Sequence, residues 1–271
     1  MAATKPKTFT INDFKARKEN HSPISMTTCY DYAFARILDD TDIDVLLVGD
    51  SLGNVFAGYE TTLPVTVEQM IYHAAIVKRG APSKFVIVDM PFMSYHISIE
   101  ETLKNAGRMI KETGVDAVKI EGGANFRDTV KALTFASIPV VGHLGMTPQS
   151  VHKFGGFSIQ GREDAQRRQI IDDAMILQES GACCIVLEKI PSLLSKELTA
   201  KLSIPTIGIG AGEFCDGQVL VINDILGIDR DFNPKFIKKY ANLNTIVKDA
   251  IVSYDREVKN RSFPSAEHSY N

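Results

Sequence analysis

Short apolar segments alternate with longer amphipathic segments along most of the chain. The short segments are apolar at consecutive positions, which is typical of parallel strands that are buried on both faces. The longer segments have helical spacing, and the caps at Thr66 and Ser98 are each followed three residues later by Gln or Glu. Strands are predicted within 24–30, 43–50, 84–90, 115–123, 138–145, 181–190, 204–212 and 218–227. Helices are predicted within 31–40, 64–80, 98–114, 124–137, 163–181, 192–202 and 234–259.

About eight such strands, separated by helices, fall within one chain of 271 residues that shows no linker and no internal repeat. This pattern predicts a (β/α)8 TIM barrel rather than an open doubly wound sheet. We expect a single domain over residues 1–271. Residues 1–23 are expected to be an N-terminal extension, either a lid or an extra helix across the bottom of the barrel. Residues from about 262 to 271 are expected to be a flexible tail.

The charge balance and the cysteines narrow the classes of function. The 30 Lys and Arg residues are matched by 33 Asp and Glu residues, so the chain lacks the basic excess of a nucleic-acid-binding protein. The first residues are polar, unlike a secretory signal, and no apolar run approaches the roughly 20 residues of a membrane span. The four cysteines form no CxxC pair, so reduced thiols and a cytoplasmic location are expected.

Polar residues end five successive predicted strands, and in a parallel barrel these strand ends meet at one rim. A single such residue is more often a helix cap or a structural polar group. A series over five strands is harder to explain in that way, because buried charges are costly unless they are paired or coordinated. We therefore predict that the rim is the functional site. The residues are Asp50 with Ser51, Asp89, Lys119 with Glu121, His143, and Glu188 with Lys189.

Three carboxylates are predicted to converge at this rim, namely Asp50, Asp89 and Glu121. Without a cation they would repel one another and raise one another's pKa. A hard divalent ion such as Mg²⁺ removes this conflict and leaves coordination positions open for substrate oxygens. No Cys or His joins the set, so zinc is less favoured. The alternative interpretation is a salt-bridge network with Lys119.

The remaining rim residues each allow two interpretations. Lys119 shares a strand face with Glu121, so it either clamps a substrate carboxylate or neutralises the carboxylate cluster. Ser51 either offers its hydroxyl and backbone N–H to an anionic ligand or is a turn residue. His143 either donates a hydrogen bond to substrate or is structural.

Glu188 ends a strand that is otherwise apolar. Apolar surroundings raise the pKa of a carboxyl group and favour a role as general base near neutral pH. The alternative is an ion pair with Lys189, which is less favoured because adjacent strand residues face opposite ways.

Several long motifs resemble the ketopantoate hydroxymethyltransferase family. They occur in order from about residue 7 to residue 230 and are GDSLGNVFAGYETTLPVTVEQMIYH, VDMPFMSY, AVKIEGG, GHLGMTPQSVHKFGGF, QGR and IPTIGIGAGEFCDGQVLVINDILG. The resemblance implies a barrel of the phosphoenolpyruvate/pyruvate-binding type, assembled as a homodecamer. It also implies transfer of a hydroxymethyl group from 5,10-methylenetetrahydrofolate to 3-methyl-2-oxobutanoate. The product is ketopantoate, an early intermediate of pantothenate and coenzyme A synthesis.

The resemblance also implies roles for individual residues. Asp50, Asp89 and Glu121 match the metal ligands, and Glu188 matches the catalytic base. The positions that bind the oxoacid are Asp50, Ser51, Asp89 and Lys119, with His143 as a further candidate. A 2-oxoacid chelates Mg²⁺ through its keto and carboxylate oxygens, so the ion would stabilise the enolate formed when Glu188 removes the C3 proton.

Two alternatives remain open at this level. The first is another enzyme of the same barrel superfamily, a 2-oxoacid lyase or mutase that would not need folate. The second is a catalytically silent barrel that binds an oxoacid. The complete set of carboxylates, lysine and glutamate counts against the silent barrel, because a protein that only binds has no need of a base. The sequence does not indicate which residues contact the folate.

Overall fold

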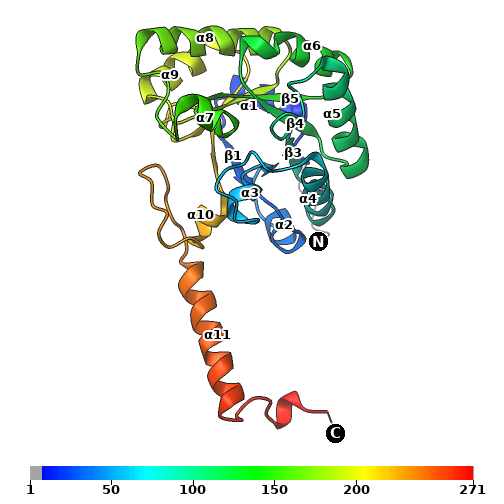
Figure 1. Ribbon diagram of the computed structural model, residues 1–271, viewed down its shortest axis with the longest axis vertical. Helices are drawn as coiled ribbons and strands as arrows, with labels where there is room; N and C mark the ends of the chain where they lie inside the picture. The colour runs from blue at the N-terminus through cyan, green and yellow to red at the C-terminus, as the bar shows by residue number, and fades with distance from the viewer. Residues whose placement is uncertain (1–7, 271) are drawn as a thin grey trace. The chain divides into compact units, whose positions relative to one another are not determined.

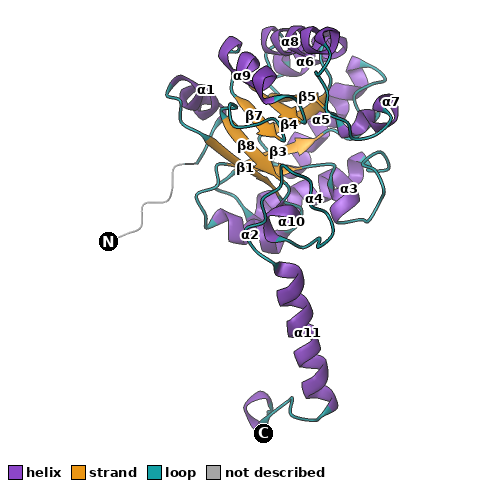
Figure 2. Cartoon of the chain, turned by 90° about the vertical axis from the view of Figure 1, so that its left-hand side faces the viewer, coloured by secondary structure: helices purple, strands orange, loops and turns teal. Residues whose placement is uncertain are grey.

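The computed structural model describes residues 8–270, and it contains a closed barrel of eight parallel strands surrounded by helices (Figures 1 and 2). Each strand pairs with the next along the chain, and β1 pairs with β8 to close the sheet. The predicted (β/α)8 barrel is therefore confirmed. The strands are β1 Ile24–Thr28, β2 Val45–Val48, β3 Phe85–Asp89, β4 Ala117–Glu121, β5 Val140–Gly145, β6 Cys184–Glu188, β7 Thr206–Ile209 and β8 Gly217–Leu220.

The helices follow the amphipathic segments, and their caps follow the predicted signals. Thr66 and Gln69 form a reciprocal capping box at the start of α4, and the Ser98 hydroxyl accepts a hydrogen bond from the Glu101 N–H at the start of α5. The helices of the barrel unit are α1 Ile11–Glu19, α2 Tyr32–Asp39, α3 Leu52–Val55, α4 Val67–Gly80, α5 Ile99–Thr113, α6 Arg127–Phe135, α7 Val151–Phe154, α8 Asp164–Glu179 and α9 Ser192–Lys201; η1 Ala124–Phe126 and η2 Pro148–Ser150 are 3₁₀ helices.

An extra helix, α1, closes the N-terminal end of the barrel. Phe14 of this helix is fully buried, and its ring packs edge-to-face on those of Phe9 and Phe85, with centroids 5.0 Å and 5.3 Å away. Phe85 is the first residue of β3, and the first residues of neighbouring strands, Ile24 and Val45, belong to the same apolar cluster. The opposite, C-terminal rim is therefore the open end on which a site can be built. Residues 1–7 of the predicted extension lie outside the described residues.

The chain divides into two compact units, one ending at Leu220 and one starting at Val221. The second unit contains α10 Ile222–Leu226, α11 Leu243–Lys259 and η3 Ala266–His268. The strand predicted over 218–227 is too long, because the chain leaves the extended conformation after Leu220 and α10 begins at Ile222. The flexible tail from residue 262 and the single-domain organisation stay predictions, and residue 271 lies outside the described residues. No helix among residues 8–270 is long and apolar enough to cross a membrane.

Candidate functional site

The predicted rim residues are brought together by the strand register. Asp89 pairs with Lys119 across β3 and β4, and Glu121 pairs with His143 across β4 and β5. Glu188 ends β6 beside Gly145. The residues from β2 to β5 are almost completely buried, with 3–4% of each residue exposed: Asp50, Asp89, Lys119, Glu121 and His143. The sequence prediction thus identified side chains from five strands that share one buried rim.

The three carboxylates and one lysine form a compact charged network. Lys119 Nζ lies 3.0 Å from Asp89 Oδ1 and 4.0 Å from Glu121 Oε1. Burial raises the pKa of Asp50 well above its usual range, and the charges of Asp89 and Glu121 raise it further. Burial also raises the pKa of Asp89, although Lys119 opposes this. Burial alone would lower the pKa of Lys119, but the neighbouring carboxylates outweigh it and raise that pKa.

Each carboxylate is held by an N–H donor at one of its two oxygens. Asp50 Oδ2 accepts from Gln149 Nε2 at 2.8 Å, Asp89 Oδ2 accepts from the Asp50 N–H at 3.0 Å, and Glu121 Oε2 accepts from the Gln149 N–H at 2.9 Å. The buried second oxygens of Asp89 and Glu121 accept no hydrogen bond, although the ammonium of Lys119 lies 3.0 Å from Asp89 Oδ1 and 4.0 Å from Glu121 Oε1. Hard, buried, incompletely satisfied oxygen atoms suit a divalent cation of the Mg²⁺ type.

The arrangement itself is that of a carboxylate–lysine network. Within residues 8–270, no three His, Cys, Asp or Glu side chains are grouped as a ready-made metal site. The ammonium of Lys119 lies beside the second oxygens of Asp89 and Glu121 instead. Carboxylate oxygens are suitable ligands for a divalent cation. In the side-chain positions of this structure, however, these oxygens form the salt-bridge network with Lys119.

His143 connects the carboxylate cluster with Glu188. Its Nδ1 lies 3.4 Å from Glu121 Oε1 and 3.2 Å from Lys119 Nζ, and its Nε2 lies 3.3 Å from Glu188 Oε2. Burial and Lys119 act to lower the pKa of His143, but Glu121 and Glu188 outweigh them, so that pKa is raised. The Glu188 side chain is 15% exposed, and Lys189 lies over the ring of Phe157 at 5.4 Å. His143 is therefore a neighbour that can orient Glu188.

Ser51 lies beside the cluster, directly before α3. Its Oγ is 2.9 Å from the hydroxyl of Tyr30, which follows β1 and is buried. The carbonyl oxygen of Tyr30 is in turn 2.6 Å from Nδ1 of the buried His73. These contacts fix the position of the Ser51 hydroxyl more firmly than an ordinary surface turn would.

The sequence reasoning missed two residues that contact the carboxylate cluster, Gln149 and Tyr95. Gln149 lies in η2, after β5, and Tyr95 lies in the loop after β3; both are nearly fully buried. The Tyr95 hydroxyl donates to Gln149 Oε1 at 2.7 Å and accepts from the Glu121 N–H at 3.1 Å. Neither residue is charged and neither ends a strand, so a search for charged strand ends could not find them. The only signal was their occurrence in long motifs, VDMPFMSY and GHLGMTPQSVHKFGGF.

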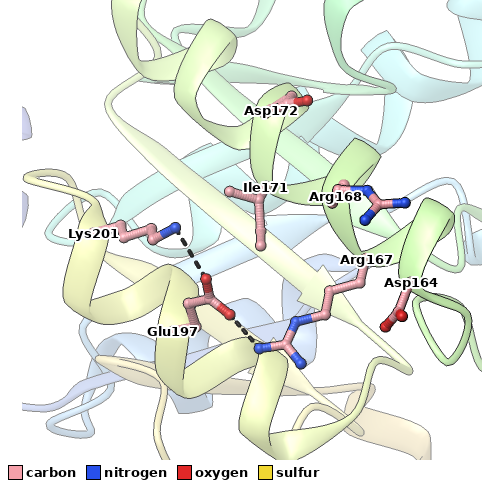
Figure 3. A pocket seen from close by; sticks show the side chains of 7 residues that line it. All are labelled: Asp164, Arg167, Arg168, Ile171, Asp172, Glu197 and Lys201. Atoms are coloured by element: carbon pink, nitrogen blue, oxygen red, sulfur yellow. Dashed lines mark hydrogen bonds and ion pairs between the residues drawn. The ribbon is translucent and has the colours of Figure 1, made fainter.

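A separate concave region lies on the outer helical layer (Figure 3), between α8 and α9. Its central charges are satisfied locally, because Glu197 pairs with both Arg167 and Lys201. None of the rim residues lines this pocket. The pocket is lined by Asp164, Arg167, Arg168, Ile171, Asp172, Glu197 and Lys201. The buried rim, where titratable side chains with shifted pKa values lie in contact, is therefore the candidate active site.

Comparisons with known proteins identify the family to which the chain is similar. Residues 8–266 match the sequence profile of a family described as ketopantoate hydroxymethyltransferase. A 3-methyl-2-oxobutanoate hydroxymethyltransferase of Pelodictyon phaeoclathratiforme is 55% identical over 257 residues, 93% of each chain. The enzyme of the same description from Syntrophus aciditrophicus is 51% identical over 98% of each chain.

Solved structures show a similar fold at much lower identity. A phosphonopyruvate hydrolase in complex with oxalate and Mg²⁺ aligns with a TM-score of 0.62 and 9% identity, covering 96% of this chain and 93% of the hydrolase. A 2,3-dimethylmalate lyase, a member of the PEP mutase/isocitrate lyase superfamily, aligns with a TM-score of 0.58 and 14% identity over 95% and 100% of the two chains. These likenesses show that the barrel fold is shared.

Proposed function

The chain belongs to the ketopantoate hydroxymethyltransferase family, and we propose that the buried rim of its barrel is the reaction centre of that activity. The activity is transfer of a hydroxymethyl group to 3-methyl-2-oxobutanoate, which forms ketopantoate in pantothenate biosynthesis. Family membership also implies 5,10-methylenetetrahydrofolate as co-substrate. The observation that carries the proposal is the convergence of three carboxylates, Lys119, His143 and Glu188 at one rim.

Asp50, Asp89 and Glu121 are the residues that would hold Mg²⁺. The bound ion would polarise the keto group of the oxoacid and stabilise the negative charge that develops when the C3 proton leaves. The second oxygens of Asp89 and Glu121 support this role, because they are buried and accept no hydrogen bond, and their present neighbour is the ammonium of Lys119. Lys119, whose raised pKa keeps it protonated at neutral pH, balances the carboxylate of the substrate. Ser51, held by Tyr30, offers a hydroxyl to the same anion.

Glu188 accepts the C3 proton of the oxoacid in this proposal. Its carboxylate lies at the same rim and is partly exposed, so substrate can reach it. His143 orients it through the 3.3 Å contact between Nε2 and Oε2 and links it to the carboxylate cluster. The C3 carbon then forms a bond to the one-carbon unit that the folate carries. Both carbon–nitrogen bonds of that unit break, water supplies the hydroxyl group of the product, and the C3 proton and the remaining proton of the water end on the nitrogens of the released tetrahydrofolate. The neighbouring hydrolases and lyases share only the fold, at 9–14% identity, so they give no support to a different reaction.

Removal of divalent metal is the experiment that tests this function. Protein treated with a chelator is expected to form no ketopantoate from 3-methyl-2-oxobutanoate and methylenetetrahydrofolate, and added Mg²⁺ is expected to restore the reaction. The measurement is the new hydroxymethyl signal in a proton NMR spectrum. A signal of equal size in the chelator-treated sample would exclude the proposed metal role, and no signal in any metal-loaded sample would exclude the function.

We also propose that the protein works as a homo-oligomer, with a homodecamer as the expected form. Helix α11 has no buried residue, and one of its faces carries four exposed apolar side chains at helical spacing: Val247, Ile251, Tyr254 and Val258. Exposed apolar stripes of this kind are typical of interaction surfaces. Light scattering should give the mass of a decamer of the 29.8 kDa chain, and a monomer at all concentrations would contradict the proposal. A cytoplasmic location remains a prediction.

A further inference from the structure

Gln149 contacts two of the three rim carboxylates at once. Its side-chain Nε2 donates to Asp50 Oδ2 at 2.8 Å and to the carbonyl oxygen of Met90 at 3.0 Å. Its backbone N–H donates to Glu121 Oε2 at 2.9 Å. Asp50 follows β2 and Glu121 ends β4, so this one residue, contributed by the segment after β5, ties together charges from two other strands.

The amide of Gln149 has little freedom to turn. Its Oε1 accepts from the Tyr95 hydroxyl at 2.7 Å, while Nε2 has the two acceptors just described. Tyr95 is itself fixed by the Glu121 N–H, which donates to its hydroxyl at 3.1 Å. Gln149 is 6% exposed and Tyr95 is 2% exposed, so water does not compete for these hydrogen bonds.

The neutrality of the Gln149 side chain matters as much as the geometry of its hydrogen bonds. Buried carboxylates repel one another and would otherwise separate or take up protons. Lys119 opposes the repulsion by adding a positive charge beside Asp89 and Glu121, whereas Gln149 holds Asp50 and Glu121 without adding any charge. The cluster therefore keeps its affinity for a cation. The amide and N–H of Gln149 also occupy one oxygen each of Asp50 and Glu121, and Glu121 Oε1 is left without a hydrogen-bond partner.

We propose that Gln149, fixed by Tyr95, is a positioning residue that holds Asp50 and Glu121 in the orientation in which they bind a divalent cation. The inference rests on the proposed metal role of these carboxylates. Partners of metal ligands typically change metal affinity by about 10–100-fold when they are removed. Gln149→Met keeps the length of the side chain and removes its amide, and Tyr95→Phe removes only the hydroxyl.

Binding of Mn²⁺, followed through the electron paramagnetic resonance signal of the free ion, tests the inference without substrate or turnover. Gln149→Met is expected to weaken Mn²⁺ binding by about 10–100-fold. Tyr95→Phe is expected to weaken it less. The fold-loss of Mn²⁺ affinity in the double variant should be smaller than the product of the fold-losses in the two single variants, because the Tyr95 hydroxyl acts partly through the Gln149 amide. The matched control is Gln160→Met, a buried glutamine that bonds to Ser158 and touches no carboxylate of the cluster, and it should bind Mn²⁺ like the parent protein.

The outcomes separate this inference from the proposed function. If the parent protein and Gln149→Met bind Mn²⁺ equally well, the proposed positioning role of Gln149 is wrong, whereas the proposed metal site is retained. If Asp50→Asn binds as tightly as the parent protein, the metal site itself is wrong and the inference fails with it. If Gln149→Met does not fold, Tyr95→Phe decides the question, since it keeps the ring and the packing. Unchanged Mn²⁺ binding in that variant would then overturn the proposal.

Discussion

Replacing Glu188 by Gln is expected to lower the rate of ketopantoate formation by about 10²–10⁴-fold, the range that a general base contributes. The amide cannot accept the C3 proton of the oxoacid. It is nearly the same size as the carboxylate, and its oxygen can keep the contact with His143 Nε2, which lies 3.3 Å from Glu188 Oε2. Binding of 3-methyl-2-oxobutanoate, measured by calorimetry with Mg²⁺ present, should therefore change little.

Glu197→Gln provides the matched control for this substitution. Glu197 lies on α9, outside the rim, where it pairs with Arg167 and Lys201. This variant should form ketopantoate at the parental rate. A Glu188→Gln variant with more than about one tenth of the parental activity would show that another group accepts the proton.

Replacing Lys119 by Met is expected to destabilise the chelator-treated protein by about 3–5 kcal/mol, because three buried carboxylates lose their cation. Lys119 acts to lower the pKa of Asp50, Asp89 and Glu121, so its loss raises all three. A carboxyl whose folded pKa is raised binds more protons in the folded state than in the unfolded state. The contribution of such a carboxyl to stability is fully present at pH values below its pKa in the unfolded state, which is 3.8 for Asp50. This contribution is lost as the pH rises through the pKa of the folded state.

The destabilisation in Lys119→Met should therefore be small near pH 4 and grow as the pH rises above it. The measurement is the melting temperature of the chelator-treated protein across this range. Lys84→Met is the matched control, since Lys84 is also buried but donates to the carbonyl oxygen of Thr41. Its destabilisation should depend much less on pH. Equal pH dependence in the two variants would contradict the charged network described for the rim.

The barrel and most of the rim could be predicted from the sequence, because both follow from short runs of apolar residues and the charged residues next to them. Buried parallel strands are apolar at every position, as in Val45–Val48, and the charged residue that follows or ends such a run necessarily lies at the rim. Asp50, Asp89 and Glu188 were found in this way. The register of the closed sheet then brings them near their partners without further assumptions.

The parts that escaped prediction depend on contacts between distant segments. Gln149 meets Asp50 across 99 positions of sequence, and no local pattern marks a neutral amide in a loop as the partner of a carboxylate. The short helices α3 and α7 lie outside the predicted helical segments, because four residues are too few to show helical periodicity. At the end of the barrel, the apolar residues after Leu220 continue into α10, and periodicity alone does not separate a strand from a short buried helix.

The most direct test of the account is exchange of the C3 proton of 3-methyl-2-oxobutanoate in D₂O without folate. Proton NMR follows the loss of that signal in the parent protein with Mg²⁺, in the chelator-treated protein and in Glu188→Gln. We predict exchange in the first sample and none above the uncatalysed rate in the other two. Full exchange in Glu188→Gln, or exchange that is unaffected by the chelator, would contradict the assignment of the rim as the centre where a metal-assisted base removes this proton.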